Sequence, residues 1–203
     1  MLEAMLSTAA AALETSRLHS AARELAHIDG LTQLPNRRRF ETDLGEEWER
    51  CRRYGRPFAL VMLDLDHFKR LNDEYGHLVG DQALRAAADG IRHVLRTSDT
   101  GYRYGGEELA LLLRETPLRE AVAVAERVRV AIEKVRIDDS AVRVTASLGV
   151  AERRVGMVSA EELVSAADAA LYTAKHTGRN RVVADSDHQQ GLPLRVIGDR
   201  ADG

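Results

Sequence analysis

The chain has 203 residues, of which 44% are hydrophobic and 30% are charged, and its 29 Lys and Arg against 32 Asp and Glu leave a formal charge of −3. Such a composition is typical of a folded protein with one sizeable core, and it disfavours a nucleic-acid-binding protein that relies on bulk positive charge. The single cysteine, Cys51, excludes an intrachain disulfide and a cysteine-based zinc site, and no apolar run approaches the ~18 residues of a membrane span.

The first 28 residues contain neither Gly nor Pro and are rich in strong helix formers, which predicts an N-terminal helix. Four residues in its second half have the a and d spacing of a coiled coil: Leu18, Ala21, Leu25 and Ile28. This helix either pairs with a second copy of the chain or packs on its own domain. At the other end, residues 186–203 are polar and contain Gly, which predicts a loose tail.

Helices and short strands alternate between these two ends. The first predicted helix is capped by Asn36 and runs to about Tyr54, and a second, short helix ends at about Tyr75, where Gly76 breaks the pattern. Three further helices are predicted at 81–96, 117–135 and 159–176, the last of them capped by Ser159. The predicted strands cover 58–63, 102–104, 108–113, 142–150 and 181–184. The first strand is apolar throughout, which is typical of a strand buried on both faces. The pattern indicates an α/β fold in which helices flank a mixed sheet.

Two aspartates at the end of the first strand are candidate metal ligands. Asp64 and Asp66 are two residues apart, so both should project from one face of the sheet while Leu65 projects from the other. Mg²⁺ binds one or two carboxylates and completes its coordination shell with water and substrate phosphates. The alternative is a helix cap in a solvated loop.

A second acidic pair, Glu107 and Glu108, follows a hairpin turn predicted at Gly105-Gly106. Glycines at a hairpin tip let a phosphate approach the backbone, and a neighbouring carboxylate can hold an ion between protein and nucleotide. The alternative is two exposed charges in a loop. Because side chains alternate between faces along a strand, we expect the two glutamates to have different roles. The chain lacks P-loop and dinucleotide glycine motifs, which leaves a carboxylate and metal design of the kind that polymerases and cyclases use.

Six motifs in order make the chain resemble the GGDEF-domain diguanylate cyclases. They are Asp29-Gly-Leu-Thr-Gln-Leu-Pro-Asn-Arg37, Asp64-Leu-Asp-His-Phe-Lys-Arg-Leu-Asn72, Gly76-His77 with Gly80-Asp81, Arg103-Tyr-Gly-Gly-Glu-Glu-Leu109, Ala146-Ser-Leu-Gly-Val150 and Ala170-Leu-Tyr-Thr-Ala-Lys-His-Thr-Gly-Arg-Asn180. The resemblance implies a fold similar to nucleotidyl cyclases and polymerase palms, with a central mixed five-stranded sheet. It also implies three parts: a signalling or dimerisation helix at 1–28, a cyclase domain at 29–185 and a flexible tail at 186–203.

The activity that the resemblance implies is the condensation of two GTP into cyclic di-GMP with release of pyrophosphate, in a homodimer that depends on Mg²⁺ or Mn²⁺. Asp64, Glu107 and the backbone carbonyl of Leu65 would bind the metal ion. Glu107 is also the implied base, with Glu108 as the alternative. Lys69 would contact the phosphates and stabilise the transition state.

Asn72 and Asp81 are implied to bind the guanine base. A carboxylate accepts hydrogen bonds from guanine N1–H and N2–H, and an amide can donate to O6. Adenine has no such donor pair, so we expect GTP to be preferred over ATP. The other substrate-binding residues that the resemblance implies are His77, Gly105, Gly106, Lys175 and Arg179. His77 either contacts the substrate or packs at the start of a helix.

Arg96 and Asp99 lie where the family has an Arg-x-x-Asp inhibitory site, which implies that the product binds there and lowers activity. Arg127 is implied as an additional contact. The alternative is an ion pair between residues three apart at a helix end. Leu109 stands where the family motif usually has Phe, so the hairpin keeps an apolar anchor but loses aromatic volume.

Two other functions are compatible with the same motifs. One is a catalytically silent domain that acts as a cyclic di-GMP receptor through Arg96 and Asp99, and the other is a GTP-binding regulator without turnover. The set of catalytic and substrate-binding residues favours the enzyme. For all three functions we expect a cytoplasmic chain that contacts neither nucleic acid nor membrane.

Overall fold

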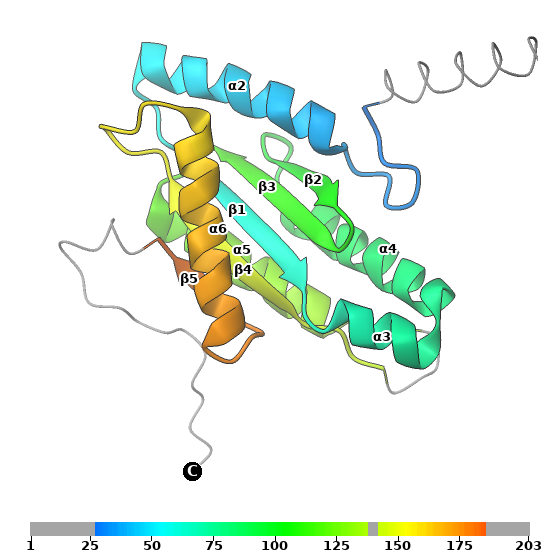
Figure 1. The fold of residues 1–203 in the computed structure, drawn as a ribbon. Coiled ribbons are helices and arrows are strands. Elements are labelled where there is room, and N and C mark those ends of the chain that lie inside the picture. Colours follow the sequence, from blue (N-terminus) through cyan, green and yellow to red (C-terminus); the bar gives the residue numbers. More distant parts are fainter. Residues whose placement is uncertain (1–26, 138–141, 186–203) are drawn as a thin grey trace, which may run out of the picture.

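The computed structural model describes residues 27–137 and 142–185, in which five strands form one sheet in the order β2-β3-β1-β4-β5 (Figure 1). The strands are β1 Phe58–Leu65, β2 Thr100–Gly105, β3 Glu108–Arg114, β4 Ala146–Glu152 and β5 Val182–Ala184. β1 is antiparallel to β3 and β4, β2 is antiparallel to β3, and β5 is parallel to β4. The prediction of a mixed five-stranded sheet is therefore confirmed.

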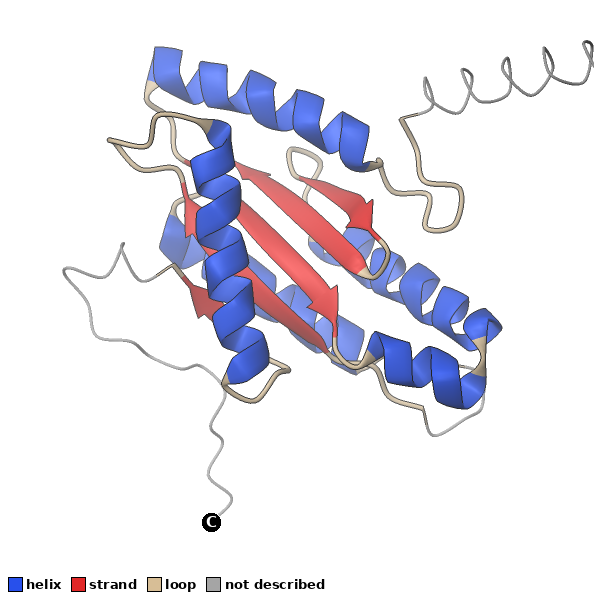
Figure 2. Cartoon of the chain, viewed as in Figure 1, coloured by secondary structure: helices blue, strands red, loops and turns tan. Residues whose placement is uncertain are grey.

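Helices lie on both faces of this sheet (Figure 2). Those in the described residues are α2 Arg37–Tyr54, α3 Phe68–Tyr75, α4 His77–Val94, α5 Leu118–Glu133 and α6 Ala160–His176. α2 and α6 pack on one face, and α4 and α5 pack on the other. The predicted helix at 1–28, apart from its last two residues, and the predicted tail at 186–203 lie outside the described residues. At Ile28 the chain is already extended and pairs with Pro35.

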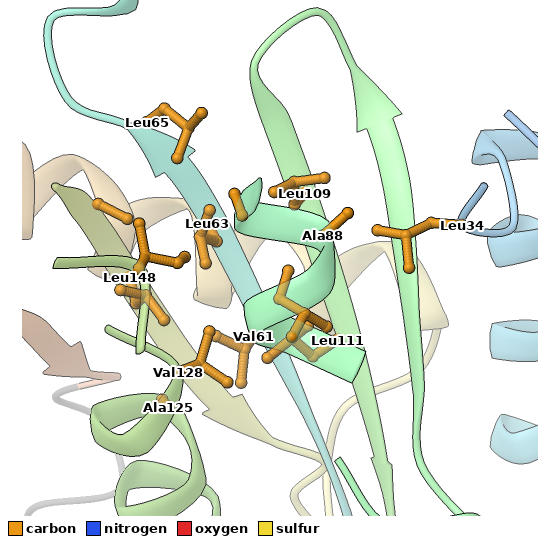
Figure 3. Close-up of a cluster of buried hydrophobic side chains, with 14 of the residues drawn as sticks. Leu34, Val61, Leu63, Leu65, Ala88, Leu109, Leu111, Ala125, Val128 and Leu148 are labelled. Atoms are coloured by element: carbon orange, nitrogen blue, oxygen red, sulfur yellow. The ribbon is translucent and has the colours of Figure 1, made fainter. Parts of the chain in front are cut away.

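The alternation of side chains along β1 divides the core into two halves. Phe58 and Met62 pack against α2 and α6, whereas Val61 and Leu63 pack against α4 and α5. Figure 3 shows the second half, in which Val61 and Leu63 lie among side chains that include Val128 of α5. Every residue of β1 is buried, as its apolar sequence predicts. The same alternation directs Asp64, the next even-numbered residue, toward the face that carries α6.

Helix boundaries follow the capping residues closely. The Asn36 side chain accepts a hydrogen bond from the Arg39 backbone amide, and Gly55 ends α2 in the left-handed region at φ 69°. α4 begins at His77, four residues before the predicted start, because Gly76 (φ 84°) ends α3 and begins α4 without a linker. Ser159 lies at the predicted cap position of α6, but its side chain makes no capping hydrogen bond.

α6 approaches the sheet unusually closely at Gly149 of β4. A Cβ atom built on Gly149 would lie 2.1 Å from the carbonyl oxygen of Ala167 and 2.1 Å from the amide nitrogen of Leu171. Only glycine permits this contact, which fixes the position of α6 and therefore of the side chains in its last turn. β4 itself begins at Ala146 rather than at Val142. Among the helices that the structure describes, none is both long enough and apolar enough to span a membrane.

Candidate active site

The end of β1 places a carboxylate against a lysine of α6. Asp64 is only 8% exposed, and Lys175 Nζ donates to Asp64 Oδ2 at 2.8 Å. The neighbouring Leu65 side chain is buried in the α4 and α5 half of the core. Lys175 lies in the last turn of α6, where the close packing at Gly149 brings it over the sheet.

The charge balance around Asp64 favours an additional cation. Burial raises the pKa of the Asp64 carboxyl, and the nearby carboxylates of Glu107 and Glu108 raise it further. The hydrogen bond and positive charge of Lys175 act in the opposite direction. Three acidic side chains therefore interact at one end of the sheet, with one lysine to oppose their repulsion.

The two glutamates come from different parts of the β2–β3 hairpin. Glu108 begins β3 and lies directly opposite Asp64 in the β1–β3 ladder. Gly105 pairs with Glu108, so the turn consists of Gly106 and Glu107, one residue later than predicted. The shift follows a register irregularity between Arg103 and Gly105. Gly106 adopts φ 39°, and the Glu107 carbonyl accepts a hydrogen bond from the Leu65 amide at 3.4 Å.

Arg103 anchors the hairpin to the segment that precedes α2. Its guanidinium donates to the Gly106 carbonyl at 2.9 and 3.1 Å and to both carboxylate oxygens of Asp29 at 3.1 Å. Asp29 also accepts from the Thr32 amide and hydroxyl, at 2.8 and 2.7 Å. Sequence reasoning missed this contact, although both residues lie in motifs that matched the family.

Aromatic contacts brace the other side of the hairpin. The Arg37 guanidinium lies 4.6 Å from the centre of the Tyr104 ring, and Phe40 meets the same ring edge-on at 5.4 Å. Leu109, which replaces the usual Phe, is fully buried in the α4 and α5 half of the core. The smaller side chain therefore still anchors the hairpin.

Asp66 shares a face with Asp64 but makes only structural contacts. Its Oδ1 accepts from the Ser147 hydroxyl at 2.6 Å, and its Oδ2 accepts from the Thr145 hydroxyl at 2.7 Å and the Asn180 amide at 3.0 Å. The prediction that the two aspartates project together is confirmed. Both oxygens of Asp66 already accept hydrogen bonds, three in all, which makes Asp64 the better candidate of the two for a metal ligand.

The donor set at this site fits a divalent cation shared with a substrate. Asp64, Glu107 and the Leu65 carbonyl offer hard oxygen ligands beside one another in the fold. Across 27–137 and 142–185, no three or more His, Cys, Asp or Glu side chains cluster closely enough to hold a metal ion by themselves. A cation here would therefore complete its shell with water and phosphate oxygens, as Mg²⁺ commonly does.

The residues implied to bind the base lie together between α3 and α4. A Cβ atom built on Gly80 would lie 1.9 Å from Asn72 Oδ1, so the Asn72 amide lies directly on the Gly80 backbone, next to Asp81. Asn72 Oδ1 is buried and has no hydrogen-bond partner among the described residues. A side chain at position 80 would therefore displace Asn72, so Gly80 is required for this contact. His77 is exposed at the start of α4.

The basic residues implied to contact phosphate surround the same end of the sheet. Lys69 is exposed on α3, directly after β1, and Lys175 contacts Asp64. Arg179 is exposed in the turn that follows α6, where it adopts φ 60°. No described contact joins Lys69 to the acidic residues.

The predicted inhibitory residues lie at the opposite end of β3. Arg96 Nε donates to Asp99 Oδ2 at 3.0 Å, and Asp99 Oδ1 accepts from the Arg114 amide at 3.2 Å. Arg96 Nη2 donates to the Arg114 carbonyl at 3.0 Å, yet just over half of its side chain remains exposed. Arg127 of α5 reaches the Val94 carbonyl at 3.5 Å. The ion pair that was the alternative interpretation is thus present, separate from the acidic cluster.

Comparison of the chain with known proteins assigns it to one family. A family model described as "Diguanylate cyclase, GGDEF domain" matches residues 26–181. Diguanylate cyclase VdcA of Vibrio cholerae is 45% identical over 182 residues, which are 86% of this chain and 52% of that protein. The chain is 40% identical to the probable diguanylate cyclase DgcC of Escherichia coli over 75% of its own length and 42% of that protein's. It spans about half the length of the curated relatives it matches.

Solved structures show the same fold. The coiled coil and GGDEF domain of DgcB from Caulobacter crescentus, in complex with c-di-GMP, has a TM-score of 0.75 and 36% identity, covering 90% of this chain and 98% of that one. Diguanylate cyclase SiaD of Pseudomonas aeruginosa, in complex with its activator SiaC, has a TM-score of 0.74 and 42% identity, covering 90% of this chain and 71% of that one. The resemblance found in the sequence and the fold that it implied are both confirmed.

Proposed function

The chain belongs to the GGDEF-domain family of diguanylate cyclases, and from this premise we propose that it condenses two GTP into cyclic di-GMP and two pyrophosphates. The observation that carries the proposal is the convergence of Asp64, Glu107, Glu108 and Lys175 at one end of the sheet. A nucleotide placed there meets acidic oxygens for a metal ion and basic groups for phosphate. Cys51 is a free, buried thiol, which is consistent with a proposed cytoplasmic location.

Recognition of guanine is proposed for Asn72 and Asp81. The Asn72 side-chain amide can donate to O6 of guanine, and the Asp81 carboxylate can accept from N1–H and N2–H. With ATP, whose base lacks this donor pair, the Asp81 carboxylate would stay unpaired. Such a site rejects the wrong substrate strongly.

Asp64, Glu107 and the Leu65 carbonyl would hold Mg²⁺, or Mn²⁺ with the same ligands. When bound, the ion neutralises charge on the triphosphate and on the leaving pyrophosphate. Lys175 Nζ donates to Asp64 Oδ2 at 2.8 Å, and we propose that it turns toward the phosphates when the nucleotide binds. Lys69 and Arg179 add positive charge where negative charge develops on the phosphoryl oxygens.

In the proposed reaction, the 3′-hydroxyl of one GTP loses its proton to Glu107, or alternatively to Glu108. Its oxygen then bonds to the α-phosphorus of the other GTP as the bond to pyrophosphate breaks. The 3′-hydroxyl of the second nucleotide then attacks the α-phosphorus of the first in the same way, and release of the second pyrophosphate closes the ring. Among the described residues, Asn72 and Asp81 provide one candidate base-binding site, so we propose a homodimer in which a two-fold axis presents each 3′-hydroxyl to the other α-phosphorus.

Product inhibition is proposed for Arg96 and Asp99, with Arg127 as a further contact. Arg96 keeps part of its guanidinium exposed, and Asp99 is already oriented by the Arg114 amide. A guanidinium can bind a phosphodiester or a guanine edge with two hydrogen bonds. The structural relative DgcB was solved in complex with c-di-GMP, which supports a product site in this family.

The proposal is tested by incubating the purified chain with GTP and Mg²⁺ and separating the nucleotides by chromatography. We expect cyclic di-GMP and pyrophosphate from GTP, no corresponding product from ATP, and no product from Glu107→Gln. Intact GTP together with tight binding of added cyclic di-GMP would instead make the chain a receptor. Intact GTP that binds tightly without cyclic di-GMP binding would make it a GTP-binding regulator.

A further inference from the structure

The turn after α6 contains three consecutive residues with positive φ. Gly178 has φ 126°, Arg179 has φ 60° and Asn180 has φ 44°. The last two carry side chains, for which this region is unfavourable. Residues held in such conformations persist where surrounding contacts fix them, and they occur often at ligand-binding sites.

Asn180 is fixed by three hydrogen bonds to three different residues. Its backbone amide donates to Asp66 Oδ2 at 3.0 Å, and its side-chain Nδ2 donates to Glu133 Oε1 at 2.9 Å. Its side-chain Oδ1 accepts from Arg129 Nη1 at 2.6 Å. Both side-chain atoms thus contact α5, while the backbone contacts the end of β1.

Arg129 is itself held rigidly on α5. It is a nearly buried arginine, with 13% of its side chain exposed, and its Nε donates to both oxygens of Glu126 at 3.0 Å. Its Nη2 donates to Glu126 at 2.8 Å and its Nη1 to Glu133 at 2.9 Å. A planar guanidinium with this many fixed partners has a defined direction. Asp66, on the other side of Asn180, is fixed by the Thr145 and Ser147 hydroxyls.

This network determines the backbone from which Arg179 extends. Arg179 directly precedes Asn180, and its amide donates back to the Ala174 carbonyl at 3.0 Å, which closes the turn onto α6. Lys175, which directly follows Ala174 in α6, makes the 2.8 Å contact with Asp64. Two of the three basic residues proposed to bind phosphate, Lys175 and Arg179, therefore flank one strained turn that Asn180 holds.

We propose that Arg129 and Asn180 are positioning residues that aim Arg179 and Lys175 at the phosphates of the bound nucleotide. The proposal rests on the proposed function. Neither residue touches the substrate, and the base pocket at Asn72 and Asp81 belongs to α3 and α4 rather than to this turn. Loss of the network should therefore weaken binding of the triphosphate and leave recognition of guanine intact.

The experiment compares two ligands by calorimetric titration of the full chain in the presence of Mg²⁺. One is 3′-deoxy-GTP, which cannot react because it lacks the attacking hydroxyl, and the other is 3′-deoxy-GMP, which lacks the β- and γ-phosphates. The variants are Asn180→Ala and Arg129→Met. The matched control is Arg119→Met, which removes an exposed arginine from the same helix.

We expect each variant to lose affinity for 3′-deoxy-GTP by about tenfold to a hundredfold, as misplaced binding groups commonly do, with 3′-deoxy-GMP affinity unchanged. The double variant should lose no more than the stronger single variant, because both changes act through one turn. Asn180→Gly tolerates positive φ without the side-chain bonds, so it should show the same selective loss even if Asn180→Ala folds poorly.

Equal loss for both ligands, or no loss for either, would overturn the positioning role while leaving the proposed function intact. Failure of the unaltered chain to bind 3′-deoxy-GTP would overturn the proposed function as well. The two failures are therefore distinguished within one set of titrations.

Discussion

Lys175 Nζ lies 2.8 Å from Asp64 Oδ2, so a residue proposed to bind phosphate is paired with a residue proposed to bind metal. Asp64 is also close enough to Glu107 and Glu108 for their charges to raise its pKa. Repulsion among these three carboxylates is therefore concentrated at the end of the sheet where the nucleotide is proposed to bind. A cation bound with the nucleotide would reduce this repulsion.

Asp64→Asn should abolish cyclase activity and stabilise the fold. The loss of a metal ligand and of charge at the reacting phosphates should lower kcat at least about 10²-fold, the effect of removing one electrostatic group from an active site. The melting temperature should rise at neutral pH, because burial and the neighbouring glutamates disfavour the ionised carboxylate. Activity assays and calorimetry on both proteins measure the two effects, and a fall in melting temperature would contradict the charge argument.

The stability gain from Asp64→Asn should depend on pH. The pKa of Asp64 is raised in the fold above its ordinary value of 3.8, so folding favours the protonated carboxyl. Ionisation of Asp64 lowers the free energy of unfolding of the unaltered chain. This destabilisation should be absent below about pH 3.8 and should grow as the pH rises toward the raised pKa of the folded state. Above that pKa it should stay constant. The difference in melting temperature between the two proteins, measured across this range, should follow that course. A difference that shrinks as pH rises would contradict the account.

Asp81→Ala should weaken discrimination between GTP and ATP. The carboxylate is proposed to accept two donors that adenine lacks, and such sites discriminate by about 10⁴-fold or more. We expect the affinity of 3′-deoxy-GTP to fall toward that of 3′-deoxy-ATP, which should change little. Titration of both nucleotides provides the measurement, with Asp73→Ala, an exposed aspartate of α3, as the matched control. Equal loss for both nucleotides would assign Asp81 a structural role.

Tyr102→Phe should destabilise the fold without altering the site. The buried Tyr102 hydroxyl donates to Asp43 Oδ2 at 2.8 Å beneath α2, and burial together with this bond raises the pKa of Tyr102. A hydrogen bond to a charged group contributes about 1.5–3 kcal/mol, so the free energy of unfolding should fall by that amount. Urea denaturation measures it, with Tyr75→Phe, an exposed tyrosine, as the control. A change below about 0.5 kcal/mol, the range of neutral surface substitutions, would show that the bond is weak.

Arg96→Lys should weaken product inhibition. Lysine keeps the positive charge but cannot form the two parallel hydrogen bonds of a guanidinium. The cyclic di-GMP concentration for half-maximal inhibition should rise about tenfold, since loss of one charge-assisted hydrogen bond costs about 1.5 kcal/mol. Initial rates with added product give this value, and an unchanged value would leave Arg96 with a structural role through its contacts to Asp99, Arg114 and Thr116.

Local patterns predicted most of the fold. The apolar run that became β1 and the caps at Asn36 and Gly55 are signals between near neighbours, and all three are found in the structure. The alternation along β1 also placed Asp64 and Asp66 on one face. The exact turn of the hairpin was not predictable, because it depends on the pairing of Gly105 with Glu108 rather than on glycine preference alone.

The roles of Asp66 and Arg103 depend on hydrogen bonds between residues that are far apart in the sequence. Asp66 accepts from Asn180, which is 114 residues away, and Arg103 donates to Asp29, which is 74 residues away. A single sequence carries no periodic or spacing signal for such pairs. The family motifs contain all four residues, but a motif marks a position without showing which partner it binds.

The most direct test of the proposed cyclase is the initial rate of cyclic di-GMP formation from GTP and Mg²⁺ at increasing protein concentration, with Asp64→Asn as the inactive control. A homodimeric cyclase predicts a rate that rises more steeply than in proportion to protein, then slows as product accumulates. Unconsumed GTP at every protein concentration, with cyclic di-GMP still bound tightly, would contradict the account.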